Sequence, residues 1–241
     1  MKLAVISDVH ANLEALEAVL ADVDAQGVRG IACLGDFVGY GASPNECIDR
    51  LTPRIEQAVV GNHDVAALGR IRLGDFNNDA ATAARWTGQQ LTAAHRAWLE
   101  RLPYQASWRG AHIVHASPLA PEEWHYVLSA VDAEEEMRAY DEPLCFIGHS
   151  HFPGTFGDDG HGAQYTRAPE VRVLEGHRYL VNVPSVGQPR DGDPRAGWLL
   201  WDQEACVLTQ RRMAYDVESA MRRIREAGLP AFLADRLQWG E

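Results

Sequence analysis

The first half of the chain alternates short apolar runs with segments of helical periodicity. Residues 2–7 (KLAVIS) are mostly apolar and predict a buried strand, whereas leucine and valine recur at helical spacing across 11–26. GIACLGD (30–36) and QAVVG (57–61) predict two more buried strands, and a helix over 43–50 opens with a Ser-Pro pair typical of a helix N-terminus. This β-α-β-α-β order predicts parallel strands, with a ligand site at their carboxyl ends.

Helix-like and strand-like segments continue through the rest of the chain. The predicted helices are 77–102, 129–140 and 216–227. The predicted strands are 111–117, 144–150, 170–175, 178–183, 197–202 and 206–213. The last four are joined by turns, which predicts antiparallel pairing, and the glycine-rich stretch 153–162 is predicted as a mobile loop.

One domain with a large core is the organisation that we expect. The chain has 241 residues and is 46% hydrophobic, and no Pro/Gly/Ser-rich linker divides its first half. We therefore predict a single domain over 1–241, with a helical segment at about 75–102. Asp8 interrupts the first apolar run, unlike a signal peptide, and no run reaches the roughly 18–20 apolar residues of a membrane span. With four widely spaced cysteines, these features predict a cytoplasmic protein with reduced thiols and no membrane partner.

The charge of the chain limits the partners that it can bind. The formal net charge is −12, so a long basic track for a nucleic acid backbone is not expected. An anionic substrate would instead need a local positive centre.

Five predicted strands end in polar blocks that contain metal-binding side chains. The blocks are SDVH (7–10), LGDFVGYG (34–41), VGNHD (60–64), VHAS (114–117) and GHSHF (148–152). Residues two apart in an extended chain point to the same face, so Asp8 and His10 can reach one site. The same holds for His149 and His151. Singly each motif is weak, but five at successive strand ends predict one cluster.

The spacing also distinguishes two histidines of one strand. His112 and His115 are three apart and point to opposite faces, so only one of them can join the cluster. We expect it to be His115, which lies nearer the end of the strand.

The order DxH…GD…GNHD…H…GHSH resembles that of the calcineurin-like metallophosphoesterases. The resemblance extends to about residue 197 and implies a four-layered α/β/β/α sandwich, in which helices flank two mixed β-sheets. It also implies two divalent metal ions and their ligands. By this resemblance the first ion is bound by Asp8, His10 and His151, the second by Asn62, His115 and His149, and Asp36 bridges both.

The ligand types narrow the choice of metal. Imidazole, carboxylate and amide groups together suit Mn, Fe, Zn or Ni better than Mg or Ca, and Mn²⁺ is the ion that we expect first. Two carboxylates against two divalent ions leave a local positive surplus that attracts an anion.

The resemblance implies an enzyme, a metal-dependent phosphoric ester hydrolase in which a metal-bridging hydroxide attacks phosphorus. His63, next to Asn62, is the expected general acid for the leaving group, a role suited to a side chain that titrates near neutral pH. Asp64 could orient His63 or cap the following helix, and both readings stay open.

The block GDFVGYG departs from the GDxVDRG pattern of Ser/Thr protein phosphatases and is similar to small prokaryotic phosphodiesterases, phosphatases and diadenosine-tetraphosphate hydrolases. Tyr40, Asn77 and Arg190 are the candidate substrate-binding residues. Arg190 could clamp a second phosphate, or it could pair with Asp191 or Asp193.

Several aromatic side chains have two open interpretations. Trp86, Trp124, His125 and Tyr126 could stack on a base or aryl leaving group, but packing in the core is the role that we expect first for each. Exposed aromatics within 75–126 would also suit a homodimer surface.

The expected function is hydrolysis of phosphodiester, and also phosphomonoester, bonds in small or nucleotide-like substrates. The first alternative is a dinucleoside-polyphosphate hydrolase that acts on molecules such as diadenosine tetraphosphate. The second is a non-catalytic metal-binding scaffold. The presence of His63 and of a suitable residue at every ligand position argues against it. A nuclease is disfavoured by the acidic charge.

Overall fold

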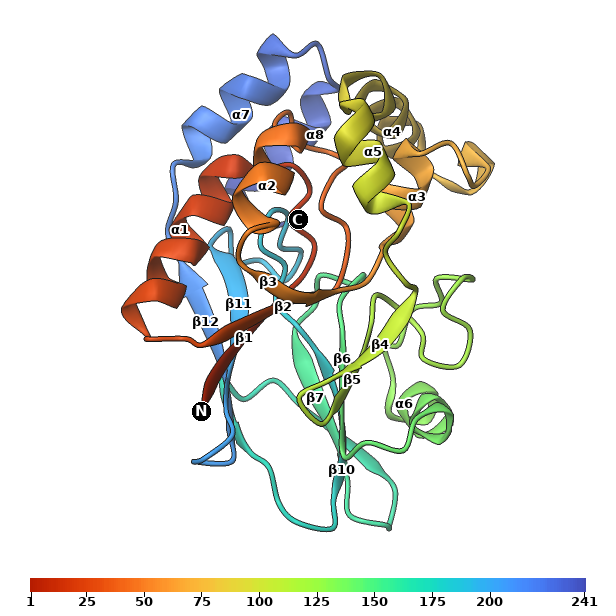
Figure 1. Ribbon diagram of the computed structural model, residues 1–241, viewed down its shortest axis with the longest axis vertical. Helices are drawn as coiled ribbons and strands as arrows, with labels where there is room; N and C mark the ends of the chain where they lie inside the picture. The colour runs from red at the N-terminus through yellow and green to blue at the C-terminus, as the bar shows by residue number, and fades with distance from the viewer.

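Two β-sheets of six strands pack face to face, and helices cover their outer faces (Figure 1). The computed structural model describes residues 1–241. This architecture confirms the predicted α/β/β/α sandwich of two mixed sheets. None of the helices combines the length and apolar character needed to cross a membrane.

Most elements of the fold lie close to predicted segments, but the strands at 105–108 and 163–166 and the helices at 62–67 and 231–235 were not predicted. The first sheet consists of β1 (Lys2–Ile6), β2 (Gly30–Cys33), β3 (Ile55–Ala58), β9 (Glu170–Arg172), β11 (Ala196–Asp202) and β12 (Val207–Met213). The second consists of β4 (Gln105–Trp108), β5 (Ala111–Val114), β6 (Leu144–Ile147), β7 (Gly154–Asp158), β8 (Ala163–Thr166) and β10 (Arg178–Asn182). The α-helices are α1 (Leu13–Ala25), α2 (Pro44–Leu51), α3 (Asn62–Ala67), α4 (Asn78–Gln90), α5 (Ala93–Leu99), α6 (Ala130–Glu136), α7 (Val217–Glu226) and α8 (Ala231–Asp235).

The strand order places several carboxyl ends at one edge. The first sheet has the order β3-β2-β1-β11-β12-β9 and the second β4-β5-β6-β10-β7-β8. β1, β2 and β3 pair in parallel, as predicted. β11 and β12 are antiparallel, also as predicted, but β10 runs parallel to β6. The prediction holds for β10 on one side only, because this strand lies inside the second sheet, between a parallel β6 and an antiparallel β7.

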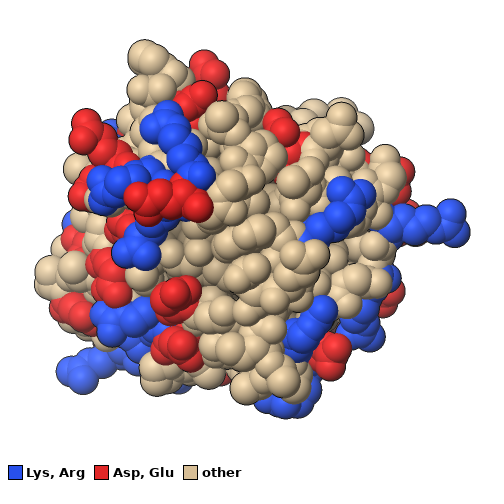
Figure 2. Space-filling view, turned by 90° about the horizontal axis from the view of Figure 1, so that it is seen from above, with Lys and Arg blue, Asp and Glu red and all other residues tan.

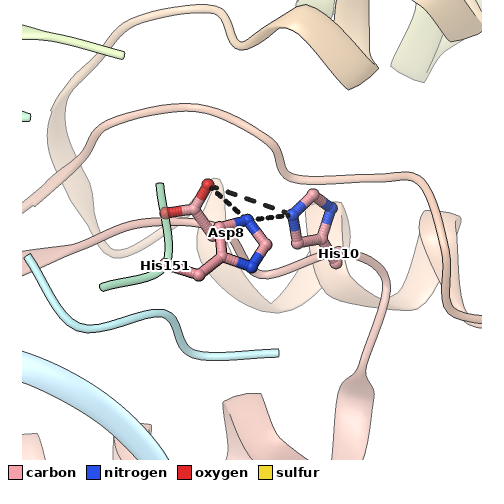
Figure 3. A group of neighbouring side chains, drawn as sticks. All are labelled: Asp8, His10 and His151. Carbon is pink, nitrogen blue, oxygen red and sulfur yellow. Dashed lines mark hydrogen bonds and ion pairs between the residues drawn. The ribbon is translucent and has the colours of Figure 1, made fainter. Parts of the chain in front are cut away.

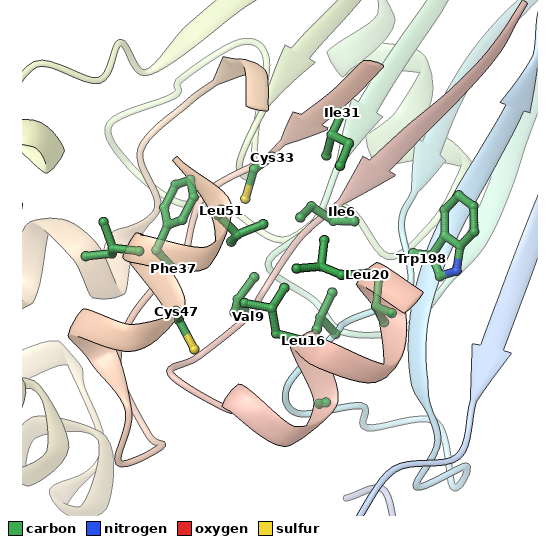
Figure 4. Packing of buried hydrophobic residues seen from close by; sticks show 14 of the residues in the cluster. Ile6, Val9, Leu16, Leu20, Ile31, Cys33, Phe37, Cys47, Leu51 and Trp198 are labelled. Carbon is green, nitrogen blue, oxygen red and sulfur yellow. The ribbon is translucent and has the colours of Figure 1, made fainter. Parts of the chain in front are cut away.

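Alternating residues of β1 contribute to two different cores. Leu3 and Val5 face the second sheet and join the apolar layer between the sheets. Ala4 and Ile6 face outward and pack under α1. Figure 4 shows this outer layer, in which Leu16 and the other apolar residues of α1 cover the sheet. Because both faces are covered, the strand is a continuous apolar run.

The predicted helix over 77–102 is divided into α4 and α5. Leu91 adopts an extended conformation with φ −56° and ψ 127°, which ends α4. The Thr92 side chain then caps α5 by accepting a hydrogen bond from the His95 amide at 3.1 Å. Helical periodicity continues across this break, so the pattern of apolar residues did not reveal it.

The predicted loop over 153–162 is wrong at its first half, which forms strand β7. Gly154 lies where an added Cβ would stand 2.3 Å from the Tyr165 ring of β8. This glycine therefore lets an aromatic ring approach the backbone of the neighbouring strand, rather than marking a loop.

Asp22 ties α1 to the first sheet and carries a prediction about stability. Its carboxylate accepts hydrogen bonds from Trp198 Nε1 at 3.0 Å and from Arg211 Nε at 2.6 Å. The Arg211 hydrogen bond is the largest cause that lowers the pKa of Asp22 in the folded protein. The ionised form therefore stabilises the fold fully above the unfolded-state pKa, and this contribution is lost as the pH falls through the folded-state pKa.

We expect Asp22→Asn to lower the free energy of unfolding by about 2 kcal/mol at pH 7. Urea denaturation of both proteins would measure this difference, which should shrink below about pH 4, where the unfolded chain begins to bind a proton at Asp22, and vanish as the pH falls through the lower folded-state pKa. An equal loss at pH 7 and pH 3 would show that ionisation of Asp22 does not matter.

Candidate metal centre

The polar blocks that end the strands meet at one edge of the sandwich. They bring together seven predicted ligands, none more than 8% exposed: Asp8, His10, Asp36, Asn62, His115, His149 and His151. Burying this many polar side chains is costly unless hydrogen bonds or ions compensate for the lost hydration. The contacts among them show how far hydrogen bonds do so.

Asp8, His10 and His151 form the first group of this cluster (Figure 3). His10 Nε2 lies 3.0 Å from His151 Nε2, and His151 Nε2 lies 3.3 Å from Asp8 Oδ1. Each ring has its Nδ1 beside a backbone carbonyl, that of Val38 for His10 and that of Gln188 for His151. If both Nδ1 atoms donate to these carbonyls, both Nε2 atoms present lone pairs to each other. Two facing lone pairs and a carboxylate fit a cation between them.

Asn62, His115 and His149 form the second group. Asn62 Oδ1 lies 3.1 Å from His115 Nε2 and 3.1 Å from His149 Nδ1. His115 Nδ1 is 2.8 Å from the Leu34 carbonyl, a contact that orients the ring in the same way. Burial disfavours the charged form of His115, yet the adjacent Asp36 carboxylate raises its pKa to about 9. The carboxylate thus favours a positive charge at this position.

Asp36 lies between the two groups. Its Oδ2 is 3.6 Å from His10 Nε2 and 3.4 Å from His115 Nε2. This oxygen is buried and has no hydrogen-bond partner, whereas Oδ1 accepts a hydrogen bond from the His63 amide at 2.8 Å. A buried carboxylate oxygen without a donor is costly, and it stands where a shared ligand of two ions would be needed. The donor set therefore fits two divalent ions.

The backbone of the cluster is held in an uncommon conformation. Five predicted ligands have left-handed φ values: Asp8 (55°), His10 (50°), Asp36 (52°), His149 (63°) and His151 (60°). Such a conformation costs on the order of 1–3 kcal/mol at a non-glycine residue and is typical of functional sites. Gly61 permits the close packing behind Asp36, because an added Cβ would lie 2.1 Å from Asp36 Oδ1.

His112, in β5, and His115, directly after it, lie in different surroundings, as their spacing predicted. His115 is fully buried in the cluster, whereas the His112 ring stacks on Tyr140 at 5.5 Å and lies 3.2 Å from Gln105 Oε1.

His63 stands beside the cluster on the first turn of α3. Its ring contacts Tyr40, with centroids 4.3 Å apart, and its buried Nδ1 has no hydrogen-bond partner. Burial lowers the pKa of His63 to about 4, although the Asp36 carboxylate opposes the shift. Burial therefore opposes the titration near neutral pH that the sequence suggested.

Asp64 caps α3. One carboxylate oxygen accepts a hydrogen bond from the Gly61 amide at 3.0 Å, and the other accepts one from the Val38 amide at 3.1 Å. The helix begins at Asn62, so Asp64 lies inside its first turn and closes back on the residue before it. Of the two open readings, these contacts support capping.

A cavity of about 800 Å³ opens from the cluster to solvent, and its wall includes His63, Tyr40, Asn77 and Arg190. Arg190 donates hydrogen bonds to Tyr40 Oη at 3.2 Å and to Gln188 Oε1 at 2.8 Å. Asn77 uses its Oδ1 to cap α4 but still lies on the wall of the cavity.

The alternative that Arg190 pairs with a neighbouring aspartate is wrong. Asp191 binds Arg212, and Asp193 binds Arg195 at 2.6 Å. The guanidinium of Arg190 is therefore free of carboxylate partners.

The aromatic candidates separate into two sets. Tyr126 is 52% exposed, and its ring stacks on His149 with centroids 4.3 Å apart. Trp124 also lines the cavity, whereas Trp86 packs against the apolar cluster formed with α7 and α8. The cavity wall also includes Arg70 and Arg72, which belong to no motif and which only the folded loop identifies.

Comparison with known families identifies the class of protein to which this fold belongs. The chain belongs to the calcineurin-like phosphoesterase superfamily, whose domain model matches residues 1–204. The family that the motifs resembled is thereby confirmed.

Individual relatives cover the whole chain. It is 38% identical over 242 residues to the uncharacterized protein MJ0912 of Methanocaldococcus jannaschii, covering 99% of this chain and 98% of the relative. The crystal structure of a metallophosphoesterase from Sphaerobacter thermophilus has 41% identity and a TM-score of 0.88, covering 100% and 99% of the two chains. The hypothetical protein PH1004 of Pyrococcus horikoshii OT3 has 19% identity, a TM-score of 0.80 and coverage of 100% and 98%, and shows the same fold.

Proposed function

We propose that the protein is a dinuclear-metal phosphoesterase that hydrolyses phosphodiester bonds in small or nucleotide-like substrates. The observation that carries this proposal is the position of Asp36 Oδ2, buried without a donor between His10 and His115. The first ion would be held by Asp8, His10 and His151, and the second by Asn62, His115 and His149, with Asp36 between them. Ions bound there supply Lewis acidity, which lowers the pKa of water and neutralises phosphoryl charge.

The protein residues around the ions have separate roles in this proposal. His63 lies on the cavity wall beside the cluster, where its ring can give a proton to the leaving oxygen. A phosphoryl anion next to His63 favours the imidazolium and so opposes the effect of burial. Tyr40 packs against the His63 ring and limits its rotation.

Arg190 is the proposed phosphate-binding residue. Its guanidinium has no carboxylate partner and is held toward the cavity by Tyr40 and Gln188. A planar guanidinium binds phosphate oxygens with two parallel hydrogen bonds, which a lysine ammonium does not reproduce.

We expect Arg190→Lys to raise KM about tenfold with a smaller change in kcat, because a charge remains but the paired hydrogen bonds are lost. Steady-state kinetics on an aryl phosphodiester would measure both constants. Arg195→Lys is the matched control in the same loop, since Arg195 binds Asp193 and lies outside the cavity. Equal effects of the two variants would remove Arg190 from the binding site.

The proposed function is tested by an assay with added Mn²⁺ across a small substrate panel. It should contain p-nitrophenyl phosphate, bis(p-nitrophenyl) phosphate, cyclic nucleotides and diadenosine tetraphosphate, compared by kcat/KM. We expect the diester to be preferred over the monoester. Preference for diadenosine tetraphosphate would favour the polyphosphate-hydrolase alternative, and no turnover with full metal occupancy would favour the scaffold.

A further inference from the structure

The cavity has two walls of different chemistry above the metal centre. The basic wall is formed by Arg70, Ile71, Arg72, Asp75, Phe76 and Asn77, in the loop after α3 and the start of α4. The aromatic wall is formed by Glu122, Glu123, Trp124, His125 and Tyr126, between β5 and α6. We propose that the substrate is a nucleotide with a second phosphoryl group, whose ring binds the aromatic wall and whose second phosphate binds the basic wall. The inference rests on the proposed phosphoesterase function and narrows its substrate.

The basic wall offers two guanidinium groups without partners. Arg70 and Arg72 are exposed, and neither makes an ion pair or a side-chain hydrogen bond in the structure. Asp75 on the same wall offsets one of their charges, so the wall keeps a net positive charge of about one unit. Figure 2 shows Lys and Arg side chains, together with some Asp and Glu, along the right edge of the molecule, the side on which α3, α4 and α5 lie in Figure 1. Free guanidinium groups beside a metal centre suit a phosphate that is not itself being cleaved.

The aromatic wall offers an exposed ring. Tyr126 is 52% exposed although one face of its ring stacks on His149 at an interplanar angle of 21°. Exposed aromatic surface next to a site is typical of a platform on which a base stacks. A nucleotide base would cover the exposed face of Tyr126, which a bare phosphate ester would leave uncovered.

The charges of the two walls set the orientation of the substrate. Glu122 and Glu123 are exposed on the aromatic wall and repel a phosphate there, whereas Arg70 and Arg72 attract it on the other. The cavity volume of about 800 Å³ lies in the upper part of the range for small-molecule sites, which leaves room for more than one phosphate ester. The shared chemistry, a ring plus a second phosphate, occurs both in phosphorylated dinucleotides and in dinucleoside polyphosphates.

A matched pair of substrates tests the basic wall. Thymidine 3′-(p-nitrophenyl phosphate) is compared with its 5′-phosphorylated form, in Mn²⁺ buffer of low ionic strength, by release of p-nitrophenol. We expect the 5′-phosphate to raise kcat/KM at least about tenfold in the native protein, and only about twofold in Arg70→Ala/Arg72→Ala. Arg29→Ala is the control, because Arg29 is exposed without an ion pair before β2, at the opposite edge of the sheet. It should keep the full preference.

A second pair of substrates tests the aromatic wall. The ratio of kcat/KM for thymidine 3′-(p-nitrophenyl phosphate) to that for methyl p-nitrophenyl phosphate isolates the effect of the base. We expect Tyr126→Ala to lower this ratio about tenfold and Tyr126→Phe, which keeps the ring, to preserve it. The ratio is needed because Tyr126 also touches His149, so that a general loss of activity would not identify stacking.

Calorimetry measures the affinities for thymidine 3′,5′-bisphosphate and thymidine 3′-monophosphate. These affinities separate failure of this inference from failure of the proposed function. Turnover of the esters without any advantage from the 5′-phosphate overturns the inference and leaves the phosphoesterase intact. If no ester is cleaved, the phosphoesterase proposal fails. The substrate inference fails with it unless the bisphosphate binds more tightly than the monophosphate and this difference requires Arg70 and Arg72. If diadenosine tetraphosphate is cleaved faster than the 5′-phosphorylated ester, and this rate depends on Arg70 and Arg72 in the same way, the two walls are supported. The substrate is then a dinucleoside polyphosphate.

Discussion

Asp36→Asn is expected to reduce kcat/KM by at least about 10³-fold and to lower the amount of bound metal. The amide keeps the size of the side chain but removes the negative charge that lies between His10 and His115. Both proposed ions depend on this carboxylate, so we expect bound Mn²⁺ to fall toward zero rather than by half. Elemental analysis after dialysis, together with hydrolysis of bis(p-nitrophenyl) phosphate, measures both effects.

Asp141→Asn is a suitable control for the charge change. Asp141 is exposed, and it lies just before β6, at the edge opposite the cluster. It should leave metal content and activity at the native level. Loss of one ion with the other retained would show that Asp36 belongs to a single metal, and native turnover in Asp36→Asn would exclude it from the centre.

His63→Gln is expected to slow hydrolysis according to the leaving group. Alkyl phosphodiesters should lose about 10²- to 10³-fold in kcat, because their alkoxide needs a proton as the bond breaks. p-Nitrophenyl esters should lose less than about tenfold, since p-nitrophenolate leaves without one. A plot of log kcat against leaving-group pKa should therefore be steeper for the variant than for the native protein.

His161→Ala provides the matched histidine control, since His161 is exposed in the turn between β7 and β8. Metal content should be native in both variants, because the proposed ligands are unchanged. An equal loss for aryl and alkyl esters in His63→Gln would assign His63 to substrate binding or structure instead of proton transfer.

The strain stored in the backbone explains why the cluster depends on the whole fold. Asp36, for example, has a φ of 52°, and its amide is close to Gly61, where an added Cβ would lie 2.4 Å from the Asp36 nitrogen. Strands β2 and β3 hold these two turns side by side through parallel pairing up to Cys33 and Ala58. The cost of the strained turns is therefore offset by sheet pairing and core packing elsewhere.

Local sequence determined the elements whose energetics are local or periodic. The apolar run of β1 and the amphipathic pattern of α1 predicted a buried strand and a covering helix, and both form. The DxH and HxH spacings placed the candidate ligands at strand ends because parallel strands direct their carboxyl ends to one edge. The alternation of side chains along a strand also predicted that His112 and His115 lie on opposite faces.

The tertiary structure decided what depends on contacts between distant segments. The position of β10 beside β6 follows from competition among strands for a place in the sheet, which no local pattern encodes. The break at Leu91 and the strand at Gly154 depend on a cap and on a neighbouring ring. Arg190 has no carboxylate partner because Arg212 and Arg195 form ion pairs with the two nearby aspartates.

The buried amide, imidazole and carboxylate in series at 62–64 show the same division. Sequence placed Asn62 and His63 beside a metal-binding motif, because their chemistry is intrinsic to the side chains. Only the fold decided that Asp64 closes the first turn of α3, since its partners are the amides of Gly61 and Val38. The two walls of the cavity likewise exist only when residues about fifty positions apart are brought together, because a binding surface is a property of packed segments and not of either one.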